Sequence, residues 1–188
     1  MRYAAFVTVC VLLAGAARAS AAVADSSANG FTVKVTLNIQ APPDDVYRKF
    51  VHNIGDWWEG AHTFSGSSHN LSFDDKPGGC FCEKLSSPGG VHLGVDRYGV
   101  QHMRVIYSFP GQRMVLSGAL GPLQTMALTG TMTIAFSAAD GGTKIDVTYA
   151  VAGYAPDGVN KLSGPVDGVI TTQFTRLKNF AEHGDPAK

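Results

Sequence analysis

Apolar residues recur at helical spacing from residue 158 to residue 183. At about 100° per residue they fall within one arc of roughly 140°, typical of a half-buried helix. The set is Val159, Leu162, Val166, Val169, Ile170, Phe174, Leu177, Phe180 and Ala181. Pro165 lacks an amide hydrogen and suits the first turn, so the pattern predicts a helix over residues 165–182 after a short turn at 157–162. Ser163 and Gln173 also point into this arc, either bonded to backbone or water or facing a cavity that is not wholly dry.

Strict alternation of apolar and polar residues from 31 to 39 predicts a half-buried first strand. Pro42, Pro43 and the acidic pair Asp44 and Asp45 then favour the start of a helix that continues to Gly55. Further strands are expected at residues 70–73, 80–85, 100–108, 113–117, 127–136 and 143–151. The turn-forming residues 139–142 join the last two strands into a hairpin.

This order of elements predicts an α+β domain over residues 31–183. A curved antiparallel sheet needs one face covered, and the C-terminal helix is the only predicted element long enough to cover it. We therefore expect the sheet to wrap around that helix. A cavity is easily left between the two.

Composition is that of one globular domain with a real core, with 188 residues, 45% hydrophobic and 16% charged. Fifteen basic residues balance fifteen acidic ones, and no run of Lys or Arg forms a basic patch. Nucleic acid is therefore a disfavoured partner.

The first nineteen residues have the pattern of a secretory signal peptide. Arg2 precedes an uncharged, mostly apolar stretch at 4–17, and Ala17-Arg18-Ala19 is a small-x-small cleavage site. A second site, at residues 22–24, would extend the signal to residue 24. The apolar stretch is shorter than the roughly 20 residues that span a bilayer, so we expect cleavage rather than stable membrane insertion. These features predict a secreted or periplasmic protein with a disordered leader at residues 20–30.

Several short segments resemble those of one protein superfamily. They are Ile39-Gln40-Ala41-Pro42-Pro43-Asp44-Asp45-Val46-Tyr47, the pair Trp57-Trp58, Gly78-Gly79-Cys80-Phe81-Cys82-Glu83 and the closing helix. Together with the order of elements they resemble the START-like superfamily, also called SRPBCC or helix-grip. Within it they are similar to the branch of the Hsp90 ATPase activator C-terminal domain and the polyketide cyclases. The resemblance covers about residues 31–180.

The resemblance implies a central cavity for hydrophobic ligands such as lipids, sterols or polyketides, without a cofactor. Some members of the superfamily are enzymes and others bind partner proteins. The superfamily shares no catalytic set, so none is carried over.

Cys80 and Cys82 point to one face of an extended strand, with Cα atoms roughly 6.6 Å apart, at the outer limit for a disulfide. We expect two packed thiols, although export would make a strained bridge conceivable. The cysteines and His62, His69 or His102 lack ligand spacing, so no metal site is expected.

His102 and Arg104 share one face of a regular strand, and Glu83 lies on the strand before it. Facing inward, the three would form a polar end of the cavity, able to hold a carboxylate or a hydroxyl. Facing outward, they would form a cross-strand ion pair that contributes little. The sequence leaves both arrangements open. Glu83 and His102 are weak catalytic candidates, because no nucleophile motif accompanies them.

Large apolar residues in irregular segments are candidates for the cavity wall: Trp58, Phe64, Leu120, Leu123, Met126 and Tyr154. The candidate ligand site combines them with Cys82, Glu83, His102, Arg104 and Gln173.

The leading hypothesis is an exported, single-domain protein that binds a small hydrophobic or amphipathic ligand; its oligomeric state is not predicted. One alternative is a cyclase or hydrolase that uses Glu83 and His102. A second is an interaction module like the Hsp90 activator, against which the signal peptide counts.

Overall fold

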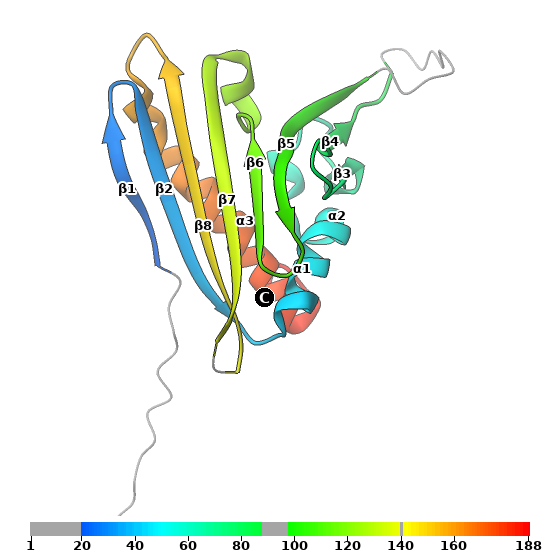
Figure 1. Cartoon of the computed structure of the whole chain (residues 1–188). Helices are drawn as coiled ribbons and strands as arrows, with labels where there is room; N and C mark the ends of the chain where they lie inside the picture. Colours follow the sequence, from blue (N-terminus) through cyan, green and yellow to red (C-terminus); the bar gives the residue numbers. More distant parts are fainter. Residues whose placement is uncertain (1–19, 88–97, 140) are drawn as a thin grey trace, which may run out of the picture.

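A single antiparallel sheet organises the molecule (Figure 1). The structure is a computed structural model that describes residues 20–87, 98–139 and 141–188, so the predicted signal peptide lies outside the described part. Within that part eight strands follow the order β1-β2-β8-β7-β6-β5-β4-β3. Their bounds are Ser20–Ser27 for β1, Gly30–Ile39 for β2, Leu71–Phe73 for β3, Cys80–Lys84 for β4, Gly99–Phe109 for β5, Arg113–Ser117 for β6, Ala127–Ala139 for β7 and Gly142–Tyr154 for β8.

The chain path explains why the sheet curls around a core on one side. After β2, the helices α1 (Pro43–His52) and α2 (Ile54–Trp57) carry the chain from one side of the sheet to β3 at the opposite edge. From there β3 to β8 run as an antiparallel meander that returns to pair with β2. β1 and β3 remain as edges, so the sheet is open.

The long C-terminal helix α3 (Ser163–His183) covers the inner side of this sheet, as Figure 1 shows. It follows the short helix η5 (Val159–Leu162) and ends where Gly184 adopts a left-handed φ of 74°. Ile170, Phe174 and Leu177 are buried along it and pack with the inward side chains of β2. The predicted α+β fold, with a curved sheet around a C-terminal helix, is confirmed and is the helix-grip arrangement.

An aromatic cluster joins the helices to the sheet. The ring of Phe50 on α1 lies 5.9 Å from the rings of both Trp57 and Phe136 and 6.2 Å from that of Phe174. Aromatic pairs at such distances stabilise a core beyond their buried area. The cluster packs the core between α1, α2, the sheet and α3.

Residues 20–27, expected to be part of a disordered leader, form the edge strand β1 instead. β1 pairs antiparallel with β2 from Ser20, opposite Thr36, to Ser27, opposite Gly30. Its small and polar residues give no apolar alternation, but an edge strand can be held by backbone hydrogen bonds without it. The domain therefore starts about ten residues earlier than the alternation in β2 indicated.

Candidate functional site

A cavity of about 440 Å³ lies between the first half of α3, the short helix η4 (Gly121–Thr125) and the segment that follows α2. Its inner wall is formed by His102 of β5 and Tyr149 of β8. The lining consists of Trp58, Ala61, His62, Thr63, Phe64, His102, Leu120, Gly121, Pro122, Leu123, Met126, Tyr149, Leu162, Pro165, Val166, Val169 and Ile170. None of these residues is Lys, Arg, Asp or Glu, so the described wall is mostly apolar with a few polar side chains.

Six of the predicted site residues line this cavity: Trp58, Phe64, His102, Leu120, Leu123 and Met126. Trp58 and Leu123 are almost completely buried, whereas Phe64 is 51% exposed and Met126 is 40% exposed. The two exposed side chains come from the segment after α2 and from the end of η4. They mark the mouth of the cavity.

Tyr154 and Gln173 were also predicted to bind the ligand, but they do not line the cavity. Tyr154, at the end of β8, is 69% exposed. Gln173 is fully buried, where its Oε1 accepts a hydrogen bond from the Glu59 amide at 2.9 Å and its Nε2 lies 3.1 Å from His62 Nδ1. It therefore ties α3 to the segment after α2, as expected of a satisfied core amide.

His102 and Arg104 do not share a face, contrary to the prediction from strand parity. The pairing of β4 with β5 shifts between Phe81, opposite Met103, and Cys82, opposite Gln101, so His102 is an extra residue in β5. Such a bulge re-aims side chains, and here His102 and Met103 both point inward while Arg104 stays exposed. Arg104 is thereby excluded from the cavity.

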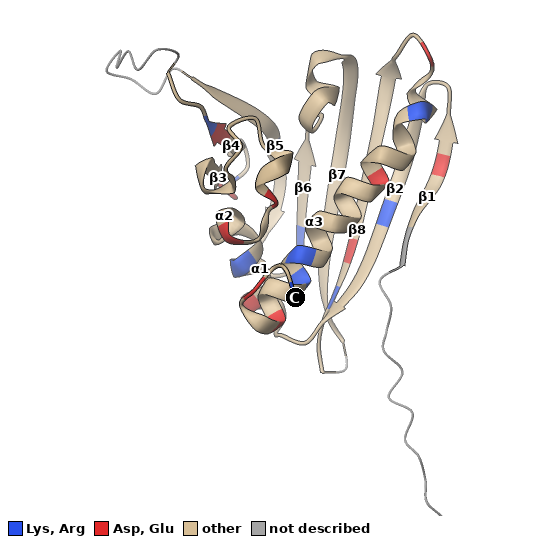
Figure 2. Cartoon of the chain, turned by 180° about the vertical axis from the view of Figure 1, so that it is seen from behind, with Lys and Arg blue, Asp and Glu red and all other residues tan. Residues whose placement is uncertain are grey.

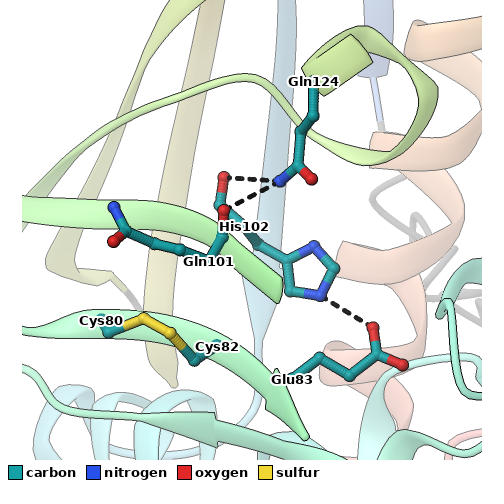
Figure 3. The surroundings of a disulfide bond; sticks show 6 residues. All are labelled: Cys80, Cys82, Glu83, Gln101, His102 and Gln124. Carbon is teal, nitrogen blue, oxygen red and sulfur yellow. Dashed lines mark hydrogen bonds and ion pairs between the residues drawn. A yellow bond between two sulfur atoms is a disulfide. The ribbon is translucent and has the colours of Figure 1, made fainter. Parts of the chain in front are cut away.

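The bulge brings His102 against Glu83, which is 2% exposed (Figure 3). His102 Nε2 lies 2.9 Å from Glu83 Oε2. The Glu83 carboxylate also accepts hydrogen bonds from the backbone amides of Phe64, at 3.0 Å, and Ser65. Glu83 therefore sits behind the histidine, outside the lining, and fixes the segment that carries Phe64.

The same histidine is attached to η4 through its backbone. Gln124 Nε2 donates to the carbonyl oxygens of Gln101, at 3.0 Å, and His102, at 3.3 Å, as Figure 3 shows. The ring of His102 also lies 4.9 Å from that of Phe81 and 5.9 Å from that of Phe64. The segment that carries Phe64 and the helix η4, which flank the mouth of the cavity, therefore both contact His102.

The surroundings set the charge states of this pair. Burial lowers the pKa of His102 below its ordinary value of 6.5, and the hydrogen bond and charge of Glu83 offset this only in part. Burial would raise the pKa of Glu83, but hydrogen bonds from Ser65, Phe64 and His102 outweigh it and hold the pKa below 4.5. At neutral pH the pair is a neutral imidazole beside a carboxylate.

Cys80 and Cys82, predicted to be packed thiols, form a disulfide on β4 (Figure 3). Their Cα atoms are 5.3 Å apart, within the normal range for a disulfide and closer than in an ideal extended strand. The covalent bond between residues two apart requires this shorter separation, and the register of β4 against β5 shifts at the same point, between Phe81 and Cys82. Phe81 and Glu83 point inward, so Cys82 lies on the other face and does not contribute to the cavity.

Tyr149 and the residues in the first half of α3 that line the cavity were not predicted from the sequence as site residues. Tyr149 occupies an inward position of β8, where its hydroxyl accepts a hydrogen bond from the Leu120 amide at 3.1 Å and burial raises its pKa to about 12. A tyrosine among the inward Ile145, Val147 and Val151 was the available signal. Alternation in this strand places Tyr149 among the inward side chains. Its hydroxyl therefore needs a hydrogen-bond partner inside the molecule.

Two further features concern ligands other than an apolar molecule. Among the described residues, no group of three or more His, Cys, Asp or Glu side chains is placed to hold a metal ion. No helix in the described ranges has both the length and the apolar character that crossing a bilayer requires. Figure 2 shows that basic and acidic residues are interspersed along the helices and strands.

Comparisons with known proteins connect the chain to others through its fold. No protein-family model matches the sequence, and no curated protein matches it. The structure is similar to CalU16 from Micromonospora echinospora, with a TM-score of 0.57, 14% identity and coverage of 89% of this chain and 86% of that one. It is also similar to an uncharacterized protein from Rhizobium leguminosarum, with a TM-score of 0.53, 22% identity and coverage of 87% and 97%.

A third similar structure is SSP2350 from Staphylococcus saprophyticus, with a TM-score of 0.53 and 17% identity over 82% of this chain and 93% of that one. At these identities the likeness concerns the backbone arrangement alone. The chain thus shares its fold with solved bacterial proteins over most of its length.

Proposed function

We propose that the chain is a START-like protein of the SRPBCC group that binds a small hydrophobic or amphipathic molecule in the cavity between the sheet, η4 and α3. The observation that carries the proposal is a preformed space of about 440 Å³ whose described lining contains no Lys, Arg, Asp or Glu side chain. Pockets of this size and character are typical of small-molecule sites. A molecule that fills the space leaves water and gains contacts with apolar side chains of the lining.

Desolvation of the ligand is the source of binding free energy. Each Å² of apolar surface removed from water contributes about 25 cal/mol. Most polar groups of the wall are already satisfied by the protein itself: Thr63 Oγ1 donates to the Gly60 carbonyl at 2.7 Å, and Tyr149 is bonded to Leu120. An apolar ligand therefore meets few polar atoms that would have to give up water.

We further propose that binding takes place outside the cytoplasm. The proposal is supported by the signal-like pattern of residues 1–19 and by the Cys80–Cys82 disulfide, because disulfides persist in oxidising compartments. Secretion or transfer to a periplasm is consistent with both the signal-like pattern and the disulfide.

A cavity-filling variant tests binding. In Val169→Trp a large ring enters the wall of the cavity, whereas in the matched control Thr172→Trp the same ring is placed at an exposed position of the same helix. Titration with the neutral fluorescent probe phenylnaphthylamine should show at least about a tenfold loss of affinity in Val169→Trp, corresponding to about 1.4 kcal/mol. Thr172→Trp should bind as the unmodified protein does.

Equal binding by all three proteins, or no binding by the unmodified protein, would contradict the proposal. Circular dichroism should show that both variants are folded. Organic extraction of the protein purified from its own host should yield a recurring apolar compound.

A second function, catalysis by proton transfer, is favoured by one observation. Glu83 holds the ring of His102 by its Nε2 atom beside an apolar cavity, an arrangement in which a carboxylate orients a general base. His102 Nδ1 would accept a proton from a carbon next to a carbonyl of the substrate, and the C–H electron pair would move onto the substrate as an enolate. Glu83 would stabilise the imidazolium until it returns the proton to the substrate.

Turnover of a β-diketone substrate distinguishes catalysis from binding alone. For an enzyme, His102→Phe should abolish turnover while the phenylnaphthylamine probe still binds. For a binding protein, the unmodified chain should bind the diketone without converting it.

A further inference from the structure

The hydrogen-bonding capacity of the cavity depends on the tautomer of His102. The Glu83 carboxylate is ionised, so it can only accept hydrogen bonds, and His102 Nε2 must donate the proton that joins them at 2.9 Å. A neutral imidazole carries one ring proton. The other nitrogen, Nδ1, is therefore left with a lone pair and accepts hydrogen bonds.

This Nδ1 atom has no hydrogen-bond partner among the described residues. Figure 3 shows it on the side of the ring away from the dashed bond to Glu83, and the ring itself lines the cavity. In the described part of the chain, the side-chain polar atoms that lack a partner and are sealed off are Asp167 Oδ1 and Thr171 Oγ1. His102 Nδ1 is not sealed, so it remains accessible to a molecule in the cavity.

Other polar groups in the wall are already engaged. Thr63 and Tyr149 bond to the backbone, with the Tyr149 hydroxyl between the Leu120 amide and the Gly118 carbonyl. The second ring, His62, has a 37% exposed side chain, and its Nδ1 lies within reach of both Gln173 and Glu59. His102 thus offers a buried acceptor in a wall whose other buried side-chain hydroxyl, that of Tyr149, is bonded to the backbone.

An anionic ligand finds no counter-charge at this position. Arg104, which could have paired with a carboxylate, is exposed on the outer face, and the lining holds neither Lys nor Arg. The nearest buried charge is Glu83, which would repel an anion. A carboxylate transferred into such surroundings without a partner is strongly disfavoured.

We infer that the cavity selects neutral amphipathic molecules whose polar end is a hydroxyl group, and that this hydroxyl donates a hydrogen bond to Nδ1 of His102. The inference rests on the proposed function and specifies its ligand class: apolar alcohols are preferred over the corresponding ethers, hydrocarbons and carboxylates. An ether fills the same space but leaves the buried acceptor without a donor.

Competition against bound phenylnaphthylamine tests this selection at pH 7.5. The competitors are dodecanol, its methyl ether and dodecanoate, which share one apolar chain. We expect dodecanol to bind about tenfold more tightly than the ether, a ratio that corresponds to one hydrogen bond of about 1.4 kcal/mol. Dodecanoate should bind more weakly than either.

Two substitutions of His102 separate the acceptor from the shape of the ring. His102→Phe keeps an aromatic ring beside Phe64 and Phe81 but removes Nδ1, so alcohol and ether should bind with equal affinity, whatever change the substitution makes to the affinity that they share. His102→Gln keeps both a donor for Glu83 and an acceptor for the ligand, so part of the preference for the alcohol should return.

The outcomes distinguish this inference from the proposal on which it rests. Binding of the probe with equal affinity for alcohol and ether would overturn the selection by His102 and leave the apolar binding site intact. A preference for the alcohol that survives in His102→Phe would also overturn it. Failure of the probe and all three competitors to bind the unmodified protein would overturn both.

Discussion

The neutral state of His102 is a consequence of where its ring lies. A charged imidazolium there would be attracted to the carboxylate of Glu83 but would lose its hydration. The loss of hydration is the larger effect, so the pKa of His102 falls. Glu83 stays ionised because the amides of Phe64 and Ser65 supply hydrogen bonds that a protonated carboxyl would not use as well. One residue is kept uncharged and its neighbour charged within the same buried pair.

This pair makes folding stability depend on pH. Between the ordinary pKa of 6.5 and the lower pKa of folded His102, the unfolded chain binds a proton that the folded protein does not. The free energy of unfolding should therefore be highest above pH 6.5 and fall as the pH decreases, by at most about 1.4 kcal/mol per pH unit. Glu83 adds a second loss below pH 4.5, because its pKa is also lower in the folded protein.

Urea unfolding from pH 7.5 to pH 5 measures this dependence. His102→Phe removes the proton-binding group, so its stability should change less with pH over this range than that of the unmodified protein. Asp146 and Glu182, whose pKa values are also lowered, are present in both proteins and titrate below this range. Parallel curves for the two proteins would show that His102 is not buried as a neutral group.

The individual side chains show how far the sequence could specify the site. Large apolar residues in irregular segments, such as Phe64 and Leu123, line the cavity, because a segment that cannot bury them elsewhere presents them there. Gln173 was ambiguous, since a polar residue on an apolar helix face suits either a ligand or a backbone partner. Only the position of the Glu59 amide decides between them.

At the scale of the element, β5 departs from the regular alternation that predicts which side chains face inward. It contains two register shifts, one at His102 against β4 and one at Ile106 against β6. Each extra residue reverses the alternation of inward and outward side chains. His102 and Arg104 therefore lie on opposite faces, and Ile106 and Tyr107 both remain exposed. A bulge depends on contacts between strands, which explains why the length of the strand was predictable and the direction of its side chains was not.

The disulfide on β4 lies opposite the bulge that places His102. Replacing both Cys80 and Cys82 by Ser removes a cross-link around a very short loop, for which chain entropy gives at most about 1.5 kcal/mol. We expect the double variant to remain folded, with its free energy of unfolding reduced by up to that amount. Urea titrations with and without dithiothreitol make the comparison.

Reduction should lower the stability of the unmodified protein and leave that of the double variant unchanged. An unmodified protein that does not respond to the reductant would contradict the cross-link as a source of stability.

At the scale of the whole molecule, the order of elements determined most of what the sequence could reveal. Alternation in β2, β7 and β8 and the apolar stripe of α3 restricted the chain to an open sheet that curves over one helix, because these are the elements with the largest apolar faces to bury. The cavity itself was expected only as a consequence of curvature. Its position toward the first half of α3 depends on how the aromatic cluster around Phe50 fills the other end, and contacts between distant segments cannot be read from periodicity.

The edge strand β1 links the architecture to the proposed export. Cleavage after Ala19 leaves all of β1 in the mature chain, whereas cleavage after Ala24 removes the half in which Ala21 pairs with Val35 and Val23 with Val33. β1 also packs against α3, so its loss exposes both the edge of β2 and part of the helix. We expect the exported protein to begin at Ser20.

Deleting residues 20–24 should then lower the free energy of unfolding by about 1–2 kcal/mol, as expected when a few exposed backbone hydrogen bonds are lost. Intact mass measurement of the secreted or periplasmic fraction identifies the first residue, and urea unfolding of the deleted form gives its stability. The deleted half of β1 belongs to an edge strand outside the lining of the cavity, so the deleted form should still bind phenylnaphthylamine. A mature chain that begins at Asp25 and is as stable as the longer form would show that β1 is dispensable, because the sheet would then tolerate β2 as its edge.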